Sequence, residues 1–337
     1  MQKNVKQWIR VAGVAALTAL AGCAHKGANV QHEVEKAATP DSARLVQALN
    51  DVFGNHQGMR GSHAKGFCAS GEFLPSAHAS QLTDSPMFKQ ASLPAEIRFS
   101  IGGGNPKASD KSRSIRGLSA SFTHDDERYD LVLISEPAFF ASTLPSFVSF
   151  LEARVPDATT KKPNPDKIKA HGERYPESKL QGALVAAHPA PASYVTTPYY
   201  STHAFKFNHA HQSQYARIVV EPVKGKYYLT EEQEQHFPDN FLQEELTGRL
   251  AKAPAVFSVY AQLRGQGDSL INSATIWSED RSRVELGKLV VKNVTEQFCD
   301  AQVFSPTNLP QGIEASDDPI LKARAGAYAV SKVKRSQ

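Results

Sequence analysis

The sequence has little cysteine, methionine or tryptophan, and no strong excess of either charge. Its 337 residues include 3 Cys, 3 Met and 2 Trp, and the formal net charge is only +4 at pH 7. The basic residues are scattered, and the densest run, from Lys332 to Arg335, is too short to indicate a nucleic-acid-binding surface. We therefore expect no nucleic-acid partner. The hydrophobic content of 41% is that of a globular chain with enough residues for a large core.

The apolar run near the N-terminus is too short for a permanent membrane-spanning helix. Basic residues within positions 3–10 precede an apolar stretch from Val11 to Leu20, a pattern typical of a signal peptide. The stretch ends in Leu20-Ala21-Gly22-Cys23, the small-residue pattern that precedes a lipid-modified cysteine. Residues 1–23 are thus predicted to be a signal peptide with a lipobox, and the protein to be exported to the periplasm. Cys23 would tether it to the membrane, whereas cleavage after Ala24 would leave it soluble.

Two cysteines, Cys68 and Cys299, remain if Cys23 carries lipid. An even pair in an oxidising compartment can form a disulfide. The sequence alone does not place their Cα atoms within bonding reach, so a disulfide and two buried thiols both stay open.

Beyond the export segment, a polar tether gives way to a mixture of helices and strands. Residues 24–44 are predicted to be a flexible tether to a domain at residues 45–337. Helical spacing of apolar residues occurs at residues 41–53, 144–153, 178–187 and 240–251, with a Pro- and Lys-rich loop at 155–167. Strands are predicted near residues 97–101, 118–122, 131–134, 204–207, 216–223 and 256–263, with a further pair between Ala274 and Val294. This order predicts an α+β domain built on an antiparallel sheet or barrel.

The last predicted helix carries the first candidate for chemistry. Capping residues and then a proline, Ser316 to Pro319, mark its start. Arg324 and Tyr328 are four residues apart and therefore share one helix face. A guanidinium beside a phenol stabilises the phenolate, which is a known axial ligand of ferric haem. The spacing alone is weak evidence, because such a pair is usually an amphipathic stem beside a surface charge.

Two further segments suggest a binding pocket. His63 lies in Arg60-Gly61-Ser62-His63-Ala64-Lys65-Gly66, where small residues let a flat ligand approach the backbone closely. A lone histidine is more often structural. In the predicted strand Ile97–Ser100, Arg98 and Ser100 occupy alternate positions, so both side chains point to the same face.

Together these segments resemble the catalase family over residues 45–337. The segment from Arg60 to Gly66 is similar to the family's distal-histidine motif, and Arg324-x-x-x-Tyr328 occupies the position of its haem ligand. Further similar segments are Ile97–Ser100, Arg116–Leu118, Asp130–Val132, Pro137–Phe140, Tyr199–Ser201, His203–Phe207, Trp277, Glu285–Leu289 and Phe304–Asn308. The resemblance implies a catalase-like fold, with an antiparallel β-barrel core and surrounding helices but without the extra C-terminal domain.

The resemblance also implies a catalytic group around haem b (iron protoporphyrin IX). Tyr328 would be the axial ligand of the haem iron, and Arg324 would hold it as the phenolate. His63 would move a proton between the two oxygens of a peroxide, and Ser100 would orient His63 by a hydrogen bond.

The remaining site residues would contact the rest of the cofactor. Arg60, Arg98 and Arg335 would pair with the haem propionates, a role that suits the bidentate guanidinium fork. Arg335 lies two helical turns after Tyr328 and reaches the same face only if the helix persists. Phe139, in the segment that resembles the family's distal side, would contact the haem.

Two positions depart from the family pattern. Ile134 stands where large catalases carry an Asn that seats the second peroxide, and Ile donates no hydrogen bond. Leu144 stands where an aromatic ring usually stacks on the haem. We therefore expect a haem peroxidase with weak catalase activity, which reduces hydrogen peroxide or organic hydroperoxides with an external small-molecule or protein electron donor in defence against oxidative stress. The family's later wrapping segment is lacking in this sequence and its N-terminal arm is short, so the resemblance implies a monomer or dimer instead of an interlocked tetramer.

Three other interpretations stay open. A catalase-fold enzyme that rearranges fatty-acid hydroperoxides would need an apolar channel, which Ile134 and Leu144 do not oppose. A non-catalytic haem-binding lipoprotein would not need the retained His63. The pair His209 and His211 could also bind a metal, but two histidines without a further nearby ligand are more often exposed loop or strand residues.

The lipobox leads to a direct test. Replacing Cys23 with Ser should release the protein from the membrane fraction, because the acylated side chain is lost. Fractionation and immunoblotting of both forms measure this. A wild-type protein found wholly in the soluble periplasmic fraction would exclude lipidation but not export.

Overall fold

The computed structural model describes residues 39–296, 299 and 301–336. The expected signal peptide, Cys23 and most of the tether lie outside the described residues. Helix α1 (Ser42–Phe53) begins within the range assigned to the tether, so residues 42–44 belong to the folded domain instead. The reason is a side-chain cap: the Asp41 carboxylate accepts a hydrogen bond from the Arg44 amide at 2.8 Å. Within the described residues, no helix is both long and apolar enough to cross a membrane.

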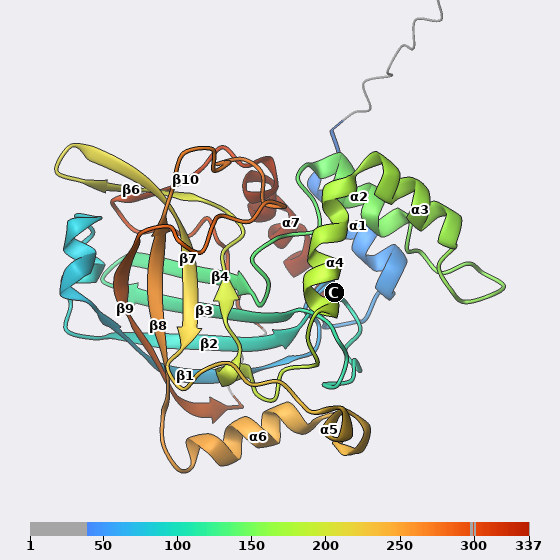
Figure 1. The fold of residues 1–337 in the computed structure, drawn as a ribbon, viewed down its shortest axis with the longest axis horizontal. Coiled ribbons are helices and arrows are strands. Elements are labelled where there is room, and N and C mark those ends of the chain that lie inside the picture. Colours follow the sequence, from blue (N-terminus) through green and yellow to red (C-terminus); the bar gives the residue numbers. More distant parts are fainter. Residues whose placement is uncertain (1–38, 297–298, 300, 337) are drawn as a thin grey trace, which may run out of the picture. The chain divides into compact units, whose positions relative to one another are not determined.

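Eight strands of the described chain close into an antiparallel barrel (Figure 1). In order around the barrel they are β1 (Gly66–Pro75), β2 (Leu93–Ile101), β3 (Arg116–His124), β4 (Glu127–Ile134), β5 (Tyr199–Tyr200), β7 (Gln212–Pro222), β8 (Ala255–Leu263) and β9 (Arg283–Thr295), which returns to β1. Two short strands, β6 (Phe205–His209) and β10 (Ile313–Ala315), continue the sheet from β7. The antiparallel barrel predicted from the sequence is therefore confirmed.

Helices cover the outside of this barrel. The helices after α1 are α2 (Leu144–Glu152), α3 (Pro165–Arg174), α4 (Lys179–Ala186), α5 (Glu231–His236), α6 (Phe241–Leu250) and α7 (Pro319–Arg335). Helices α1, α2 and α7 share a small apolar cluster that includes Leu45, Leu151 and Ala323. These three helices form a layer at one side of the barrel, whereas α5 and α6 lie below it in Figure 1.

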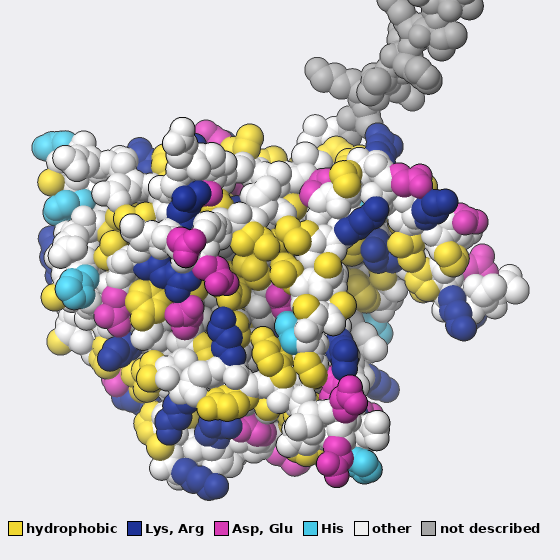
Figure 2. Space-filling model, in the orientation of Figure 1, with side chains coloured by type: hydrophobic (Ala, Val, Ile, Leu, Met, Phe, Trp, Pro, Cys, Tyr) yellow, Lys and Arg dark blue, Asp and Glu magenta, His cyan; other side chains and the backbone are white. Residues whose placement is uncertain are grey.

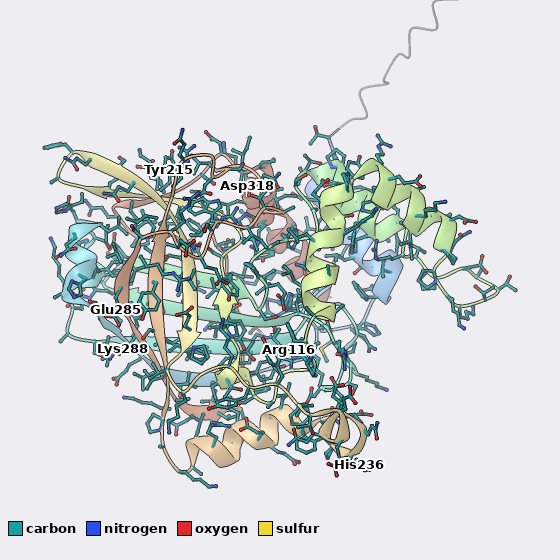
Figure 3. The ribbon with its side chains drawn as sticks, viewed as in Figure 1. Arg116, Tyr215, His236, Glu285, Lys288 and Asp318 are labelled. Atoms are coloured by element: carbon teal, nitrogen blue, oxygen red, sulfur yellow. A yellow bond between two sulfur atoms is a disulfide. The ribbon has the colours of Figure 1, made fainter. Side chains whose placement is uncertain are left out.

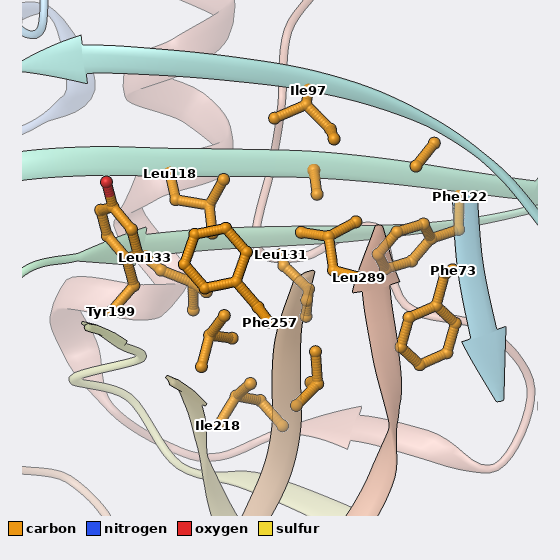
Figure 4. Packing of buried hydrophobic residues seen from close by; sticks show 14 of the residues in the cluster. Phe73, Ile97, Leu118, Phe122, Leu131, Leu133, Tyr199, Ile218, Phe257 and Leu289 are labelled. Carbon is orange, nitrogen blue, oxygen red and sulfur yellow. The ribbon is translucent and has the colours of Figure 1, made fainter. Parts of the chain in front are cut away.

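The barrel interior holds the main hydrophobic core. Ile97, Phe99, Leu118 and Phe122 are at most 1% exposed, and they belong to one cluster with residues of β4, β7, β8 and β9. Figure 4 shows Ile97, Leu118 and Phe122 converging with side chains from the other strands. Burial of one such side chain stabilises the fold by about 1.5–3 kcal/mol. Because alternate residues of a strand point to opposite faces, the residues between them face outward, towards the helices.

Three local expectations from the sequence were wrong. The pair of strands expected between residues 274 and 294 is one long strand, β9, preceded by a loop. The Pro- and Lys-rich loop ends early, because Asn164 caps α3 by accepting a hydrogen bond from the Asp166 amide. Strand β1 was not predicted, because its glycines interrupt the alternation of apolar and polar residues that indicates a strand. Gly71 is required there, since a Cβ atom would lie 1.9 Å from the carbonyl oxygen of Val290.

Candidate active site

A cavity of about 430 Å³ lies between the outer face of strands β2–β4 and helices α1, α2 and α7. The residues predicted from the sequence for the site all line this cavity: Arg60, His63, Arg98, Ser100, Phe139, Arg324, Tyr328 and Arg335. Ile134 and Leu144, the two positions that depart from the family pattern, line it as well. The fold thus brings together residues that are far apart in the sequence.

His63 is held at the cavity by its backbone and by Ser100. Its φ angle of +53° lies in the left-handed region that non-glycine residues seldom adopt and that occurs at functional sites. The Nδ1 atom lies 3.0 Å from the hydroxyl oxygen of Ser100 on β2, as the sequence predicted. Nε2 is therefore the ring nitrogen that remains for a substrate.

Gly117 on β3 makes room for this pair, a role that the sequence did not reveal. A Cβ atom at this position would lie 2.5 Å from the Ser100 hydroxyl oxygen and 2.7 Å from His63 Nδ1. Strand register places Gly117 opposite Ser100 on one side and opposite Ile134 on the other. Directly opposed residues of antiparallel strands point to the same face, so Ile134 shares this surface with Ser100.

The electrostatics of the cavity keep His63 uncharged. Burial in the cavity lowers the pKa of His63 to about 3, and the positive charges of Arg98, Arg324 and Arg60 act in the same direction. A neutral imidazole at physiological pH can accept a proton. This is the state that a general base requires.

Helix α7 presents a whole face to the cavity. Asp318 caps its first turn by accepting hydrogen bonds from the Ile320 and Leu321 amides. The cavity-lining residues of α7 follow helical spacing: Ile320, Ala323, Arg324, Ala327, Tyr328, Ser331 and Arg335. The helix persists to Arg335, which confirms that this residue reaches the same face as Tyr328.

Arg324 and Tyr328 are directly bonded. The Arg324 Nε atom donates to the phenolic oxygen of Tyr328 at 3.0 Å, and Arg324 Nη2 also donates to that oxygen. The guanidinium is therefore directed at the oxygen that a haem iron would bind.

The sequence did not predict a buried contact between His203 and Asp318 near Arg324. His203 Nδ1 lies 2.8 Å from Asp318 Oδ2, and both side chains are at most 3% exposed. Burial lowers the pKa of His203, the Asp318 carboxylate opposes this, and the charge of Arg324 lowers the pKa further. His203 lines the cavity, and Figure 3 labels Asp318 beside α7. Asp318 was recognised only as a helix cap, because its partner is 115 residues away.

The three predicted propionate-binding arginines converge from three elements. Arg60 precedes β1, Arg98 lies on β2, and Arg335 ends α7. Arg60 Nη2 donates to the carbonyl oxygens of Cys299 and Gln302, each at 2.9 Å, and Arg335 Nη2 donates to the Gln302 oxygen at 2.8 Å. Their positive charges therefore gather at one part of the cavity wall.

Aromatic side chains form much of the apolar wall. The rings of Phe139 and Phe140 are 4.3 Å apart, and those of Phe140 and Phe150 are 4.2 Å apart. Phe147 stacks on Phe140 at 5.3 Å, close to Leu144 at the start of α2. The cavity thus combines a flat apolar lining with cationic groups, a combination suited to a planar apolar ligand that bears carboxylates.

The structure also answers the question that the sequence left open about the cysteines. Cys68 and Cys299 form a disulfide with a Cα–Cα distance of 5.7 Å. The pair packs with Phe304 and Val132, which line the cavity.

Two other features lie apart from these residues. His209 and His211 lie at the β6–β7 turn, where His209 pairs with Asp84 at 2.8 Å. Among the described residues, no group of three or more His, Cys, Asp or Glu is arranged to hold a metal. A second cavity, of about 580 Å³, holds none of the residues predicted for the site, and its Arg283 pairs with Glu221 at 3.1 Å. On the face in Figure 2, basic and acidic side chains are intermingled.

Comparison with known proteins agrees with this arrangement. The sequence model of the catalase family matches residues 43–336. The chain belongs to the catalase family. Within the family, a catalase-related peroxidase from Synechococcus elongatus is 35% identical, over 98% of this chain and 97% of its own length. A second protein of that name, from Mycolicibacterium paratuberculosis, is 33% identical, over 87% of this chain and 93% of its own length.

A solved structure of the catalase family supports the fold. Catalase A from Saccharomyces cerevisiae has a TM-score of 0.74 with this chain at 23% identity. The match covers 82% of this chain and 61% of the yeast chain, so the chain spans about three-fifths of that larger protein.

Catalase family proteins bind haem, and the residues of this cavity fit that group. The donor set contains a phenol bonded to a guanidinium, an uncharged imidazole and three further arginines, around aromatic walls. A phenolate suits ferric iron, arginines suit carboxylates, and aromatic rings suit a porphyrin face.

The lowered pKa of His63 predicts a specific pH dependence of stability. Between pH 6.5 and about 3, the unfolded chain binds more protons at this residue than the folded chain. The contribution of His63 is therefore complete above pH 6.5 and is lost as the pH falls through that window. Haem-free His63→Gln protein should lose less stability than the wild type between pH 6.5 and about pH 4, measured by urea unfolding. His78→Gln, which changes an exposed histidine, should follow the wild type, and identical curves for all three proteins would contradict the expectation.

Proposed function

We propose that this protein is a haem peroxidase that reduces hydrogen peroxide or organic hydroperoxides with electrons from an external donor. One observation carries the proposal. The same cavity is lined by a tyrosine bonded to an arginine and by an uncharged histidine bonded to a serine. The two relatives named catalase-related peroxidase, which match nearly the whole chain, support it.

The proposed cofactor is haem b, with Tyr328 as the axial ligand of the iron. Arg324 would keep the phenolate by its two hydrogen bonds. Arg60, Arg98 and Arg335 would bind the propionates, and Phe139 would pack on the porphyrin edge. When bound, the haem iron supplies the site at which the peroxide O–O bond is cleaved.

The proton chemistry would belong to His63. Its neutral ring would accept a proton at Nε2 from one oxygen of the peroxide and return it to the other oxygen, which would depart as water or an alcohol. Ser100 fixes the ring through Nδ1, and Gly117 leaves the space that this contact needs. Burial and the surrounding arginines favour return of the proton from the imidazolium, because they lower its pKa.

The balance between peroxidase and catalase turnover would depend on Ile134. Oxidation of a second hydrogen peroxide to dioxygen needs that molecule to be held beside the histidine. Ile134 lies on the same surface as Ser100 and offers no hydrogen-bond donor or acceptor there. We therefore propose weak catalase activity.

We also propose that the protein acts outside the cytoplasm. The basic start, the apolar residues 11–20 and the lipobox at Cys23 support export to the periplasm and a lipid tether. Defence of the cell envelope against peroxides would be the corresponding role.

The ligand assignment can be tested by spectroscopy. Tyr328→Phe removes the oxygen that would bind iron, so the high-spin ferric spectrum of a phenolate-ligated haem should disappear. Absorption and electron paramagnetic resonance spectra of the purified protein measure this. Tyr227→Phe, at a tyrosine that is 58% exposed, is the matched control and should leave the spectra unchanged. An unchanged spectrum in Tyr328→Phe would show that another residue binds the iron.

The activity itself can be tested by measuring donor oxidation and oxygen release at equal peroxide concentration. The wild type should oxidise a dye-like donor and release little oxygen. His63→Ala should slow donor oxidation by about 10²–10⁴-fold at unchanged haem content, because the acid–base group is lost. Ile134→Asn should raise the ratio of oxygen to oxidised donor, whereas Ile271→Asn, at an exposed isoleucine, should not.

Two results would contradict this function. Rapid oxygen release by the wild type without donor oxidation would identify a true catalase. Consumption of a fatty-acid hydroperoxide without donor oxidation would identify the rearranging enzyme, an alternative that the apolar wall around Phe140 favours.

A further inference from the structure

The Cys68–Cys299 disulfide lies directly beside the arginines of the cavity. In the pairing of β1 with β2, Cys68 is the partner of Arg98. Cys299 follows the end of β9, whose Thr295 also pairs with Cys68. The disulfide therefore joins the barrel wall that carries Arg98 to the chain segment that follows β9.

That segment supplies the carbonyl oxygens that orient the other two arginines. The Gln302 amide donates to the Cys299 carbonyl at 3.2 Å, which defines one turn. The Cys299 oxygen accepts from Arg60, and the Gln302 oxygen accepts from both Arg60 and Arg335. We call Cys299 and Gln302 the carbonyl turn.

The carbonyl turn also adjoins the cavity lining. Val303 and Phe304, which follow it, line the cavity, and Phe304 packs with both cysteines and with Val132. Movement of this turn would therefore change the cavity wall as well as the directions of Arg60 and Arg335.

The direction of each guanidinium matters at this site, because a guanidinium must be correctly directed for a bidentate contact with a carboxylate. The carbonyl oxygens of Cys299 and Gln302 fix the Nη2 atom of Arg60, and the Gln302 oxygen also fixes the Nη2 atom of Arg335.

We propose that the Cys68–Cys299 disulfide is a positioning element of the cofactor site, which holds the carbonyl turn so that Arg60 and Arg335 point at the haem propionates. The oxidised chain then retains haem more tightly than the reduced chain. This inference rests on the proposed function, in which these arginines bind the cofactor. It makes haem retention depend on the redox state of the compartment: reduction adds two electrons and two protons to the S–S bond, gives two thiols, and loosens the site.

Haem loss from the loaded protein is the measurement that tests this. Transfer of haem to excess apomyoglobin should be about tenfold faster for Cys68→Ser/Cys299→Ser than for the wild type, which corresponds to ~1.4 kcal/mol, within the range of one charge-assisted hydrogen bond. Wild-type protein treated with dithiothreitol, which is oxidised to its cyclic disulfide, should behave like the variant. This second preparation keeps the test valid if the double variant folds poorly.

Two controls separate positioning from general stability. Val259→Ala removes packing from the buried face of β8, away from the cavity, and should lose haem at the wild-type rate although it unfolds more easily. In an Arg60→Ala/Arg335→Ala background, removal of the disulfide should change the rate less than threefold, because the groups that it positions are gone.

The outcomes are distinct. Equal haem loss from the oxidised, reduced and Ser-substituted proteins would overturn the inference, and so would a tenfold effect that persists without the two arginines. Failure of the oxidised wild type to bind haem at all would instead overturn the proposed function.

Discussion

The two faces of one stretch of barrel wall, from β2 to β4, hold different chemistry, and strand register determines which residue lies on which face. Odd-numbered residues of β2, such as Ile97 and Phe99, fill the closed core, while Arg98 and Ser100 face the helices. A shift of register by one residue would bury the arginine in the core and expose the phenylalanine. Closure of the barrel removes this freedom, because each of these strands is paired on both edges. The strands that line the cavity are held in place by the same hydrophobic core, which takes no part in the chemistry.

The second organising feature is the set of hydrogen bonds that directs the arginines of the cavity. Arg324 is bonded to a phenol, and carbonyl oxygens accept from Arg60 and Arg335. The buried Asp318 is shared between a helix cap and His203, so one carboxylate fixes both the start of α7 and the surroundings of Arg324. Burial keeps His63 uncharged, and the charges of Arg98, Arg324 and Arg60 act in the same direction.

The parts of the site that follow from local periodicity could be predicted from the sequence, and the parts that depend on packing could not. The alternation that directs Ser100 and the helical spacing that unites Arg324 with Tyr328 are properties of single elements. The resemblance to the catalase family added the order of the motifs. The contact of His203 with Asp318, like the disulfide at Cys299, joins segments more than a hundred residues apart. The disulfide depends on the pairing of β1 with β9, and the contact of His203 with Asp318 depends on the packing of α7. Strand β1 itself was not predicted, because its glycines interrupt the alternation of apolar residues.

The pairing of β1 with β9 has a consequence for how the chain reaches this state. Cys68 and Thr295 are strand partners, so the barrel can close only when segments more than two hundred residues apart in the sequence come together. Chains dominated by such distant contacts have high relative contact order and fold slowly. Unpaired strands then stay exposed for longer, and exposed strand edges favour aggregation. A chain of this topology should therefore depend strongly on chaperones while it folds, whatever the stability of the finished barrel.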